Sequence, residues 1–146
     1  MAIRALLVED SIPIRALLRR RLERLGCDVV GEAGTAEEGL ERFHELLPDL
    51  VTLDLMMPDI NGIDAKQLFR TIRTESPKAV VIVISVRPKS IEASAFLREG
   101  ALAYLEKPFI SLASLTKPLA RIFPELKPGV FSKLTTGSTN DPDNRL

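Results

Sequence analysis

The chain has 146 residues, of which 45% are hydrophobic and 27% are charged, and this balance is typical of one globular domain with a sizeable core. Twenty basic and twenty acidic residues cancel, which argues against nucleic acid or a membrane surface as the main partner. The single cysteine, Cys27, excludes an internal disulfide. We find neither a membrane-length apolar run nor a signal peptide, so we expect a cytoplasmic protein without membrane insertion.

Residues 3–8 are almost continuously apolar, as expected of a strand that is buried on both faces of a parallel sheet. The run ends in Glu9 and Asp10, so this strand delivers two carboxylates at its C-terminal end. Ser11 can cap a following helix, and Gly26 stops it. The apolar positions of this helix recur at helical spacing and are Ile14, Leu17, Leu18, Leu22 and Leu25.

The opposite face of this helix is basic. We expect it to be a solvated face, with a docking surface for an acidic partner as the alternative. Its members are Arg15, Arg19, Arg20, Arg21 and Arg24.

Residues 28–33 are predicted to form a short strand. Thr35, with Glu38 three residues later, is typical of a capping box at the start of the second helix, which Pro48 ends. His44, the only histidine, lies on this helix beside acidic residues, so we expect its side chain to point into solvent rather than to act as a ligand or a base.

Residues 50–54 run without interruption from apolar side chains into Asp54, and Pro58 and Asn61-Gly62 then indicate a loop. Asp54 is therefore expected where a central strand ends. Ligands collect at this carboxyl edge in open α/β sheets. A carboxylate buried there needs a cation or a lysine nearby.

The second half of the chain repeats the strand–helix alternation. Residues 65–72 indicate a third helix, which ends near Ser76-Pro77. Residues 79–85 form the most apolar run in the chain and are predicted to be an interior strand that ends in Ser85.

After this strand, Ser90 can cap a helix that extends to Glu99 and stops at Gly100. Residues 101–105 are predicted to be the fifth strand, which Glu106 and Lys107 follow.

A last helix is indicated by Leu112, Leu115, Leu119 and Ile122, and Pro118 disturbs it. Either the helix kinks at Pro118, or it begins near Thr116 with Pro118 in its first turn. Residues 135–146 are polar, and we expect a flexible tail of residues 125–146 after a domain of residues 1–124.

Five strand–helix repeats predict an α/β fold with a doubly wound, five-stranded parallel sheet in the order 2-1-3-4-5, the flavodoxin-like (βα)5 arrangement. This order brings the ends of the first, third, fourth and fifth strands to one edge of the sheet.

These strand ends carry Glu9 and Asp10, Asp54, Ser85 and Lys107. Three carboxylates at one edge repel one another, and a hard divalent cation such as Mg²⁺ relieves the repulsion. A cation, an ammonium and a hydroxyl can together hold a phosphoryl group while a carboxylate attacks phosphorus, giving an aspartyl phosphate.

Two other kinds of site fit less well. A Rossmann-type nucleotide site requires a glycine-rich turn after the first strand, and that position holds Glu9-Asp10-Ser11. A metal-dependent hydrolase usually needs a further base or histidine near the metal, and His44 is badly placed for it.

Four segments together are similar to the motifs of receiver domains of two-component response regulators, in the same order and spacing. They are residues 8–11, 53–58, 84–85 and 107–109. The similarity extends from about Ile3 to Phe123 and is strongest to stand-alone, chemotaxis-type receivers.

The resemblance implies that a sensor histidine kinase phosphorylates Asp54. It also implies that Asp10, Asp54 and the backbone carbonyl of Met56 bind Mg²⁺ directly. Glu9 stands where the family usually has aspartate, and its longer arm is expected to reach a metal-bound water.

The resemblance further implies that Lys107 and Ser85 bind the phosphoryl oxygens and that the Lys107–Pro108 peptide bond is cis. Tyr104 matches the switch aromatic of the family, which turns inward as the hydroxyl residue moves toward the phosphate; a half-buried strand residue with a wet hydroxyl is the alternative. Val86 stands where a small residue is usual and is expected to narrow access to the phosphorylation site.

The sequence therefore predicts a phosphorylation-switched signalling protein rather than an enzyme with an external substrate. An unknown downstream protein is expected to recognise the face formed by the fourth helix, fifth strand and fifth helix, the last of which contains Pro118. A phosphorelay intermediate and an unphosphorylated interaction module remain alternatives, and we expect a monomer or a weak homodimer.

Overall fold

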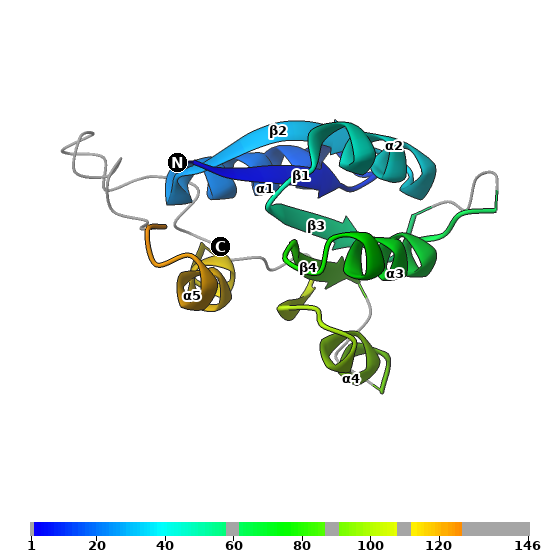
Figure 1. Cartoon of the computed structure of the whole chain (residues 1–146). Helices are drawn as coiled ribbons and strands as arrows, with labels where there is room; N and C mark the ends of the chain where they lie inside the picture. The colour runs from blue at the N-terminus through cyan, green and yellow to red at the C-terminus, as the bar shows by residue number, and fades with distance from the viewer. Residues whose placement is uncertain (1, 58–61, 87–90, 108–111, 127–146) are drawn as a thin grey trace.

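The computed structural model of the protein describes residues 2–57, 62–86, 91–107 and 112–126. Five parallel strands form one sheet in the order β2-β1-β3-β4-β5, which confirms the predicted fold class (Figure 1). The strands are β1 (Ile3–Val8), β2 (Cys27–Ala33), β3 (Leu50–Asp54), β4 (Val80–Ser85) and β5 (Ala103–Glu106). The helices are α1 (Ile12–Leu25), α2 (Ala36–Leu46), α3 (Ala65–Glu75), α4 (Ile91–Arg98) and α5 (Leu112–Ile122).

Helices cover both faces of the sheet and divide the core in two. Side chains of α1 and α5 pack on one face, with Leu22 and Leu119 both fully buried there. Side chains of α2, α3 and α4 pack on the other face, where the rings of Phe69 and Phe96 meet edge to face at 5.0 Å. Both faces of the sheet are therefore apolar, and this explains the uninterrupted apolar runs of its strands. Among the described residues, no helix is both long enough and apolar enough to cross a bilayer.

The strand register aligns the carboxyl ends of four strands. Val8 pairs with Leu53, and Asp54 pairs with Ile84. Ser85 in turn pairs with Glu106. The four strands therefore end at nearly the same level, and the polar residues at their ends lie along one edge of the sheet.

Local sequence signals set the helix ends. Ser11 caps α1 by accepting a hydrogen bond from the N–H of Ile14, and Gly26 ends it with φ of 100°, which a residue without Cβ adopts without strain. Thr35 caps α2 by accepting from the N–H of Glu38 at 3.1 Å. Leu47 closes α2 with φ of 45°, so a leucine occupies the left-handed conformation that usually favours glycine.

Three element boundaries differ from the expected ones. Strands β2 and β4 are each displaced by one residue at the N-terminal end, and β5 begins at Ala103 rather than at Ala101. The N–H of Ala101 bonds to the carbonyl of Phe96 and still belongs to the end of α4, which leaves the strand to start later.

Helix α5 runs from Leu112 through Pro118 to Ile122, so the expectation that it begins near Thr116 is wrong. An interior proline removes one helical hydrogen bond. Leu115 and Leu119 lie on either side of it and are fully buried, and their burial offsets that loss.

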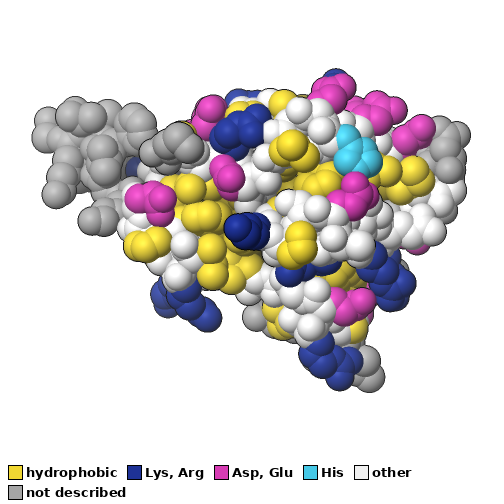
Figure 2. All heavy atoms as spheres, viewed as in Figure 1, with side chains coloured by type: hydrophobic (Ala, Val, Ile, Leu, Met, Phe, Trp, Pro, Cys, Tyr) yellow, Lys and Arg dark blue, Asp and Glu magenta, His cyan; other side chains and the backbone are white. Residues whose placement is uncertain are grey.

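The expectation of a solvated basic face on α1 is wrong at Arg21, whose side chain is fully buried. Arg15 and Arg19 are also engaged, because both form ion pairs with Glu32 of β2. The prediction for His44 is confirmed: its side chain lies on the surface beside Glu75, as the cyan atoms of Figure 2 show.

Several expectations concern residues outside the described ranges. These are the loop residues Pro58 and Asn61, the helix cap Ser90, the cis bond at Pro108 and the tail beyond Leu126.

Candidate functional site

The site lies where β1, β3, β4 and β5 end. The C-terminal ends of β1 and β3 place Glu9 and Asp54 side by side, because Val8 and Leu53 are register partners. Lys107 follows β5, and its backbone N–H donates to the carbonyl of Ser85 at 2.8 Å. Residues that are up to 98 positions apart in the chain thus meet at one edge of the sheet.

Lys107 bridges two buried carboxylates. Its Nζ lies 2.7 Å from Oε1 of Glu9 and 3.1 Å from Oδ2 of Asp54. The side chains of Lys107, Glu9 and Asp54 are 9%, 1% and 0% exposed. One ammonium cannot neutralise two buried carboxylates, so the cluster retains an excess of negative charge when both are ionised.

Backbone N–H groups hold both carboxylates. The N–H of Met56 donates to Oδ1 of Asp54 at 3.0 Å, and the N–H of Ser11 donates to Oε2 of Glu9 at 3.0 Å. Within the described part of the chain, the other oxygen of each carboxylate is buried and accepts no hydrogen bond, with only the ion pair to Lys107 beside it. A further cation bound to either of these oxygens would share it with Lys107.

The charges of the site perturb one another. Burial raises the pKa of Glu9 from 4.5 to about 7, against the lowering effect of Lys107 and of the Ser11 N–H. Burial acts to raise the pKa of Asp10 as well, but hydrogen bonding with Asp54 and Glu9 and the charge of Lys107 outweigh it and lower the pKa. Burial acts to lower the pKa of Lys107, and the hydrogen bond to Glu9 with the charge of Asp54 outweighs it and raises the pKa.

The donor set fits a hard divalent cation. Glu9, Asp10 and Asp54 each offer a carboxylate oxygen, and these oxygens lie within 4.8 Å of one another. Asp10 is exposed while the other two are buried, so the cluster opens to solvent on the side of Asp10. Carboxylate oxygens with room for several waters suit Mg²⁺.

The remaining predicted site residues lie around this cluster. Ser85 is fully buried at the end of β4, and Tyr104 is 2% exposed and packs with the core side chains beneath α4, so the half-buried alternative for Tyr104 is wrong. The side chains of Met56 and Val86 are 44% and 58% exposed, so both lie at the solvent-facing rim.

Arg15 is a neighbour of the site that sequence reasoning missed. Its Nη1 donates to the backbone carbonyl of Glu9 at 3.1 Å. A helical side chain points back toward the N-terminus of its helix, and Arg15 lies just over one turn after Ser11. This geometry is the signal that could have placed Arg15 at the end of β1 instead of in solvent.

The fold and this edge define a class: a doubly wound α/β domain with an acidic, lysine-bridged site at the carboxyl end of its sheet. The family model of the response regulator receiver domain matches residues 5–120, and the chain belongs to this family.

Individual relatives support the same assignment. The chemotaxis protein CheY of Thermotoga maritima is 36% identical over 75% of this chain and 88% of that protein. The protein-glutamate methylesterase/protein-glutamine glutaminase of the same organism is 34% identical over 99% of this chain, but this covers only 40% of that enzyme. A chain in the crystal structure of the CheX-CheY-BeF3-Mg²⁺ complex from Borrelia burgdorferi matches with a TM-score of 0.74 at 25% identity, over 83% of this chain and 89% of that chain.

Membership of the family fixes the general role. Receiver domains act in two-component signalling, bind Mg²⁺ at an acidic pocket and are not by themselves catalytic enzymes. CheY-like receivers interact with histidine kinases and with downstream targets. In this chain the carboxylates of Glu9, Asp10 and Asp54 lie close together at the end of the sheet.

Proposed function

We propose that the protein is a phosphorylation-activated response regulator in which Asp54 accepts a phosphoryl group from a sensor histidine kinase. The observation that carries the proposal is the position of Asp54 itself. Its carboxylate is fully buried at the end of the central strand, 3.1 Å from the ammonium of Lys107, and shares a cluster with Glu9 and Asp10. A carboxylate in this setting is oriented, charge-compensated and close to a cation site, and phosphoryl transfer depends chiefly on positioning and charge neutralisation.

The residues of the cluster have separate roles in the proposed transfer. A carboxylate oxygen of Asp54 forms a bond to phosphorus while the phosphorus–nitrogen bond to the kinase histidine breaks, and the imidazole leaves. The Met56 N–H holds the carboxylate of Asp54 in orientation at 3.0 Å. Lys107 moves from pairing with Asp54 to pairing with a phosphoryl oxygen, and the hydroxyl of Ser85 donates to another.

Magnesium would be held by Asp10, Asp54 and the backbone carbonyl of Met56, with Glu9 acting through a bound water. When bound, Mg²⁺ neutralises charge on the phosphoryl oxygens. The convergence of carboxylate oxygens from Glu9, Asp10 and Asp54 within 4.8 Å of one another supports this arrangement.

The output surface we propose is the face formed by α4, β5 and α5. A groove of about 370 Å³ lies on this face, and Leu97, Tyr104, Lys117 and Pro118 line it. Phosphorylation adds charge at the nearby strand ends and shifts the equilibrium between conformations of Ser85 and Tyr104. The buried ring of Tyr104 is then the element that links the site to the groove.

Substitution of the acceptor tests the proposal. Asp54→Asn keeps the shape of the side chain but removes the nucleophile, so the variant should take up no phosphate from acetyl phosphate with Mg²⁺ while it retains the fold. Asp28→Asn is the matched control, because Asp28 is exposed on β2 and should be phosphorylated at the normal yield. Intact-protein mass spectrometry reads both outcomes, and a phosphate adduct of normal yield on the Asp54→Asn variant would overturn the assignment.

Two other functions share this site. A phosphorelay intermediate would pass the phosphate on to a second histidine, and an unphosphorylated interaction module would not accept it at all. Incubation with purified candidate kinases, radiolabelled ATP and Mg²⁺, followed by addition of a histidine phosphotransfer protein, separates the three by where the label resides.

We further propose a cytoplasmic protein in which residues 1–124 are the receiver domain. Residues after about Thr135 are proposed to be dispensable for phosphorylation because their sequence is polar. Leu126, at the start of the expected tail, is buried and packs with the core. The kinase and the downstream protein are the proposed partners, and the protein is proposed to be a monomer or a weak homodimer.

A further inference from the structure

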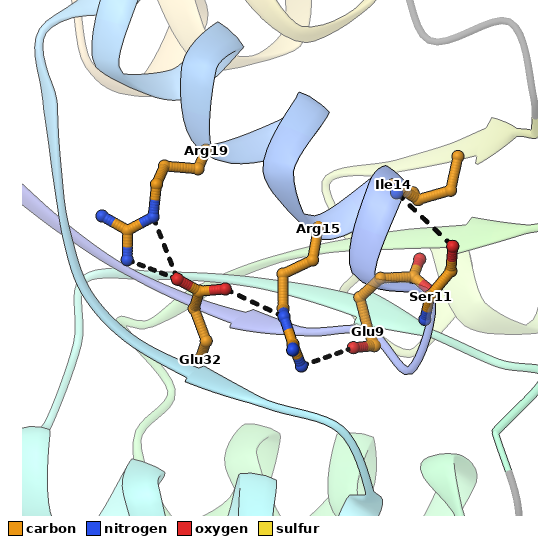
Figure 3. A network of polar contacts seen from close by, with 6 residues as sticks. All are labelled: Glu9, Ser11, Ile14, Arg15, Arg19 and Glu32. Carbon is orange, nitrogen blue, oxygen red and sulfur yellow. Dashed lines mark hydrogen bonds and ion pairs between the residues drawn. The ribbon is translucent and has the colours of Figure 1, made fainter.

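Two ion pairs and one hydrogen bond connect β2 and α1 to the carboxyl end of β1. Figure 3 shows Arg15 of α1 between Glu32 and Glu9, and Arg19 on the far side of Glu32. The Nε of Arg15 lies 2.9 Å from Oε1 of Glu32, while its Nη1 donates to the backbone carbonyl of Glu9 at 3.1 Å. Arg19 holds the other oxygen of Glu32 through its Nε, at 3.0 Å.

With these contacts, both the backbone and the side chain of Glu9 are held by hydrogen bonds. Its backbone N–H donates to the carbonyl of Ala33 at 2.9 Å, and its backbone carbonyl accepts from Arg15. Its side chain accepts from the N–H of Ser11 at 3.0 Å and from Lys107 at 2.9 Å. Because Asp10 is the next residue, a fixed carbonyl on Glu9 also fixes the peptide plane that enters Asp10.

The contact requires an arginine. Nε and Nη1 belong to one planar guanidinium, so the carbonyl and Glu32 are held in a fixed relation to each other. A lysine has one nitrogen on a flexible stem and cannot span both acceptors with the same geometry. Glu32 anchors the fork through the ion pair to Nε of Arg15.

Removal of Arg15 should change the affinity for Mg²⁺ in opposite directions, depending on whether Arg15 acts through its charge or by positioning the backbone. The positive charge of Arg15 repels Mg²⁺, so its removal should strengthen binding if charge alone matters. If Arg15 matters because it holds the backbone of Glu9 and Asp10, its removal should weaken binding. An ion pair of this exposure is otherwise expected to contribute little, because the side chains of Arg15 and Glu32 are 21% and 33% exposed.

We propose that Arg15, anchored by Glu32, is a positioning residue for the magnesium site, and this rests on the proposed function of that site. The guanidinium holds the backbone between Glu9 and Asp10 so that both carboxylates face Asp54 before the ion arrives. Groups that orient metal ligands commonly change metal affinity by 10–100-fold when they are lost. Arg15 acts on the backbone rather than on a ligand atom, so we expect the lower end, about tenfold.

The test is magnesium affinity, measured by calorimetry because the chain has no tryptophan to report binding by fluorescence. Arg15→Lys keeps the charge but loses the fork, and it should raise the Mg²⁺ dissociation constant about tenfold. Glu32→Gln removes the anchor and should have the same effect. Arg19→Lys is the matched control: Arg19 also contacts Glu32 but makes no described contact with Glu9, and we expect less than a twofold change.

Hydrogen–deuterium exchange without Mg²⁺ gives an independent readout. The amides of Asp10 and Ser11 should exchange faster in Arg15→Lys than in the wild type or in Arg19→Lys. A wild type that binds Mg²⁺, together with an Arg15→Lys variant that binds it equally well, would overturn this inference alone. A wild type that binds no Mg²⁺ would instead overturn the proposed function.

Discussion

The metal-free protein is expected to become more stable when the pH falls from about 7.5 to about 5. Glu9 is the cause, because burial raises its pKa from 4.5 to about 7. A group with a raised pKa binds its proton more tightly in the folded state than in the unfolded chain. Its contribution is therefore complete below about pH 4.5 and is lost as the pH rises through about 7.

The size of the effect follows from this difference in pKa. Between about pH 5 and pH 7.5, nearly the whole change in the protonation of Glu9 takes place in the folded state, which corresponds to about 2 kcal/mol of unfolding free energy. The two other shifted groups of the site titrate outside this pH range, and so does Cys27, whose pKa burial raises from 9.0 to about 12. The pKa of Asp10 is lowered from 3.8, so its contribution is lost only in more acidic solution, and that of Lys107 is raised from 10.5, so its contribution is lost only in more alkaline solution.

Urea titrations in the presence of EDTA measure this dependence. Glu9→Gln mimics the protonated side chain and should remove most of the slope. His44→Gln, a substitution of an exposed side chain, should keep it. Saturating Mg²⁺ should reverse the dependence, since binding requires ionised carboxylates. An unfolding free energy that is the same at both pH values in EDTA, or a Glu9→Gln variant with the wild-type slope, would refute the reasoning.

Three further substitutions test local features. Leu47→Gly should raise the unfolding free energy, measured in urea titrations, by about 1 kcal/mol, because glycine adopts the φ of 45° at this position without strain. Leu47 is 66% exposed, so little packing is lost, and Leu47→Ala should give no gain. Gly39→Ala should lower the unfolding free energy by about 1–2 kcal/mol, although alanine has the better helix propensity, because the added Cβ would lie 2.9 Å from Leu68. A stabilised variant would contradict this packing. Val86→Ala should speed both phosphate uptake from acetyl phosphate and phosphate loss by up to about tenfold, which corresponds to lowering the barrier by about 1.4 kcal/mol. Equal rates in the two proteins would show that Val86 does not restrict access to the site.

The strand order and the meeting of Glu9, Asp54 and Lys107 at one edge could be predicted because the end of each strand is visible in the sequence pattern. A buried parallel strand must be apolar throughout, so the residue at which polarity begins marks its end, and Asp54 and Ser85 were found in this way. The parallel order then brings such ends together without any knowledge of side-chain packing.

Features that depend on tertiary contacts could not be predicted. Arg21 looks like a surface residue in a helical pattern, yet tertiary packing buries it completely. Pro118 argues against an interior helix position on propensity alone, and only the packing of its neighbours allows it. The ion pair between Arg15 and Glu32 joins a helix to a strand whose relative placement the sequence pattern does not set.

The contact between Lys107 and Glu9 spans 98 residues, which has a consequence for how the protein matures on the ribosome. Strands β1, β2 and β3 are adjacent in the sheet and can pair while the second half of the chain is still being synthesised. At that stage Glu9 and Asp54 lie next to each other without their ammonium partner, and their repulsion opposes closure of the edge. Docking of β5 supplies Lys107, so we expect this edge of the sheet to gain stability only after β5 has been synthesised and has paired with β4.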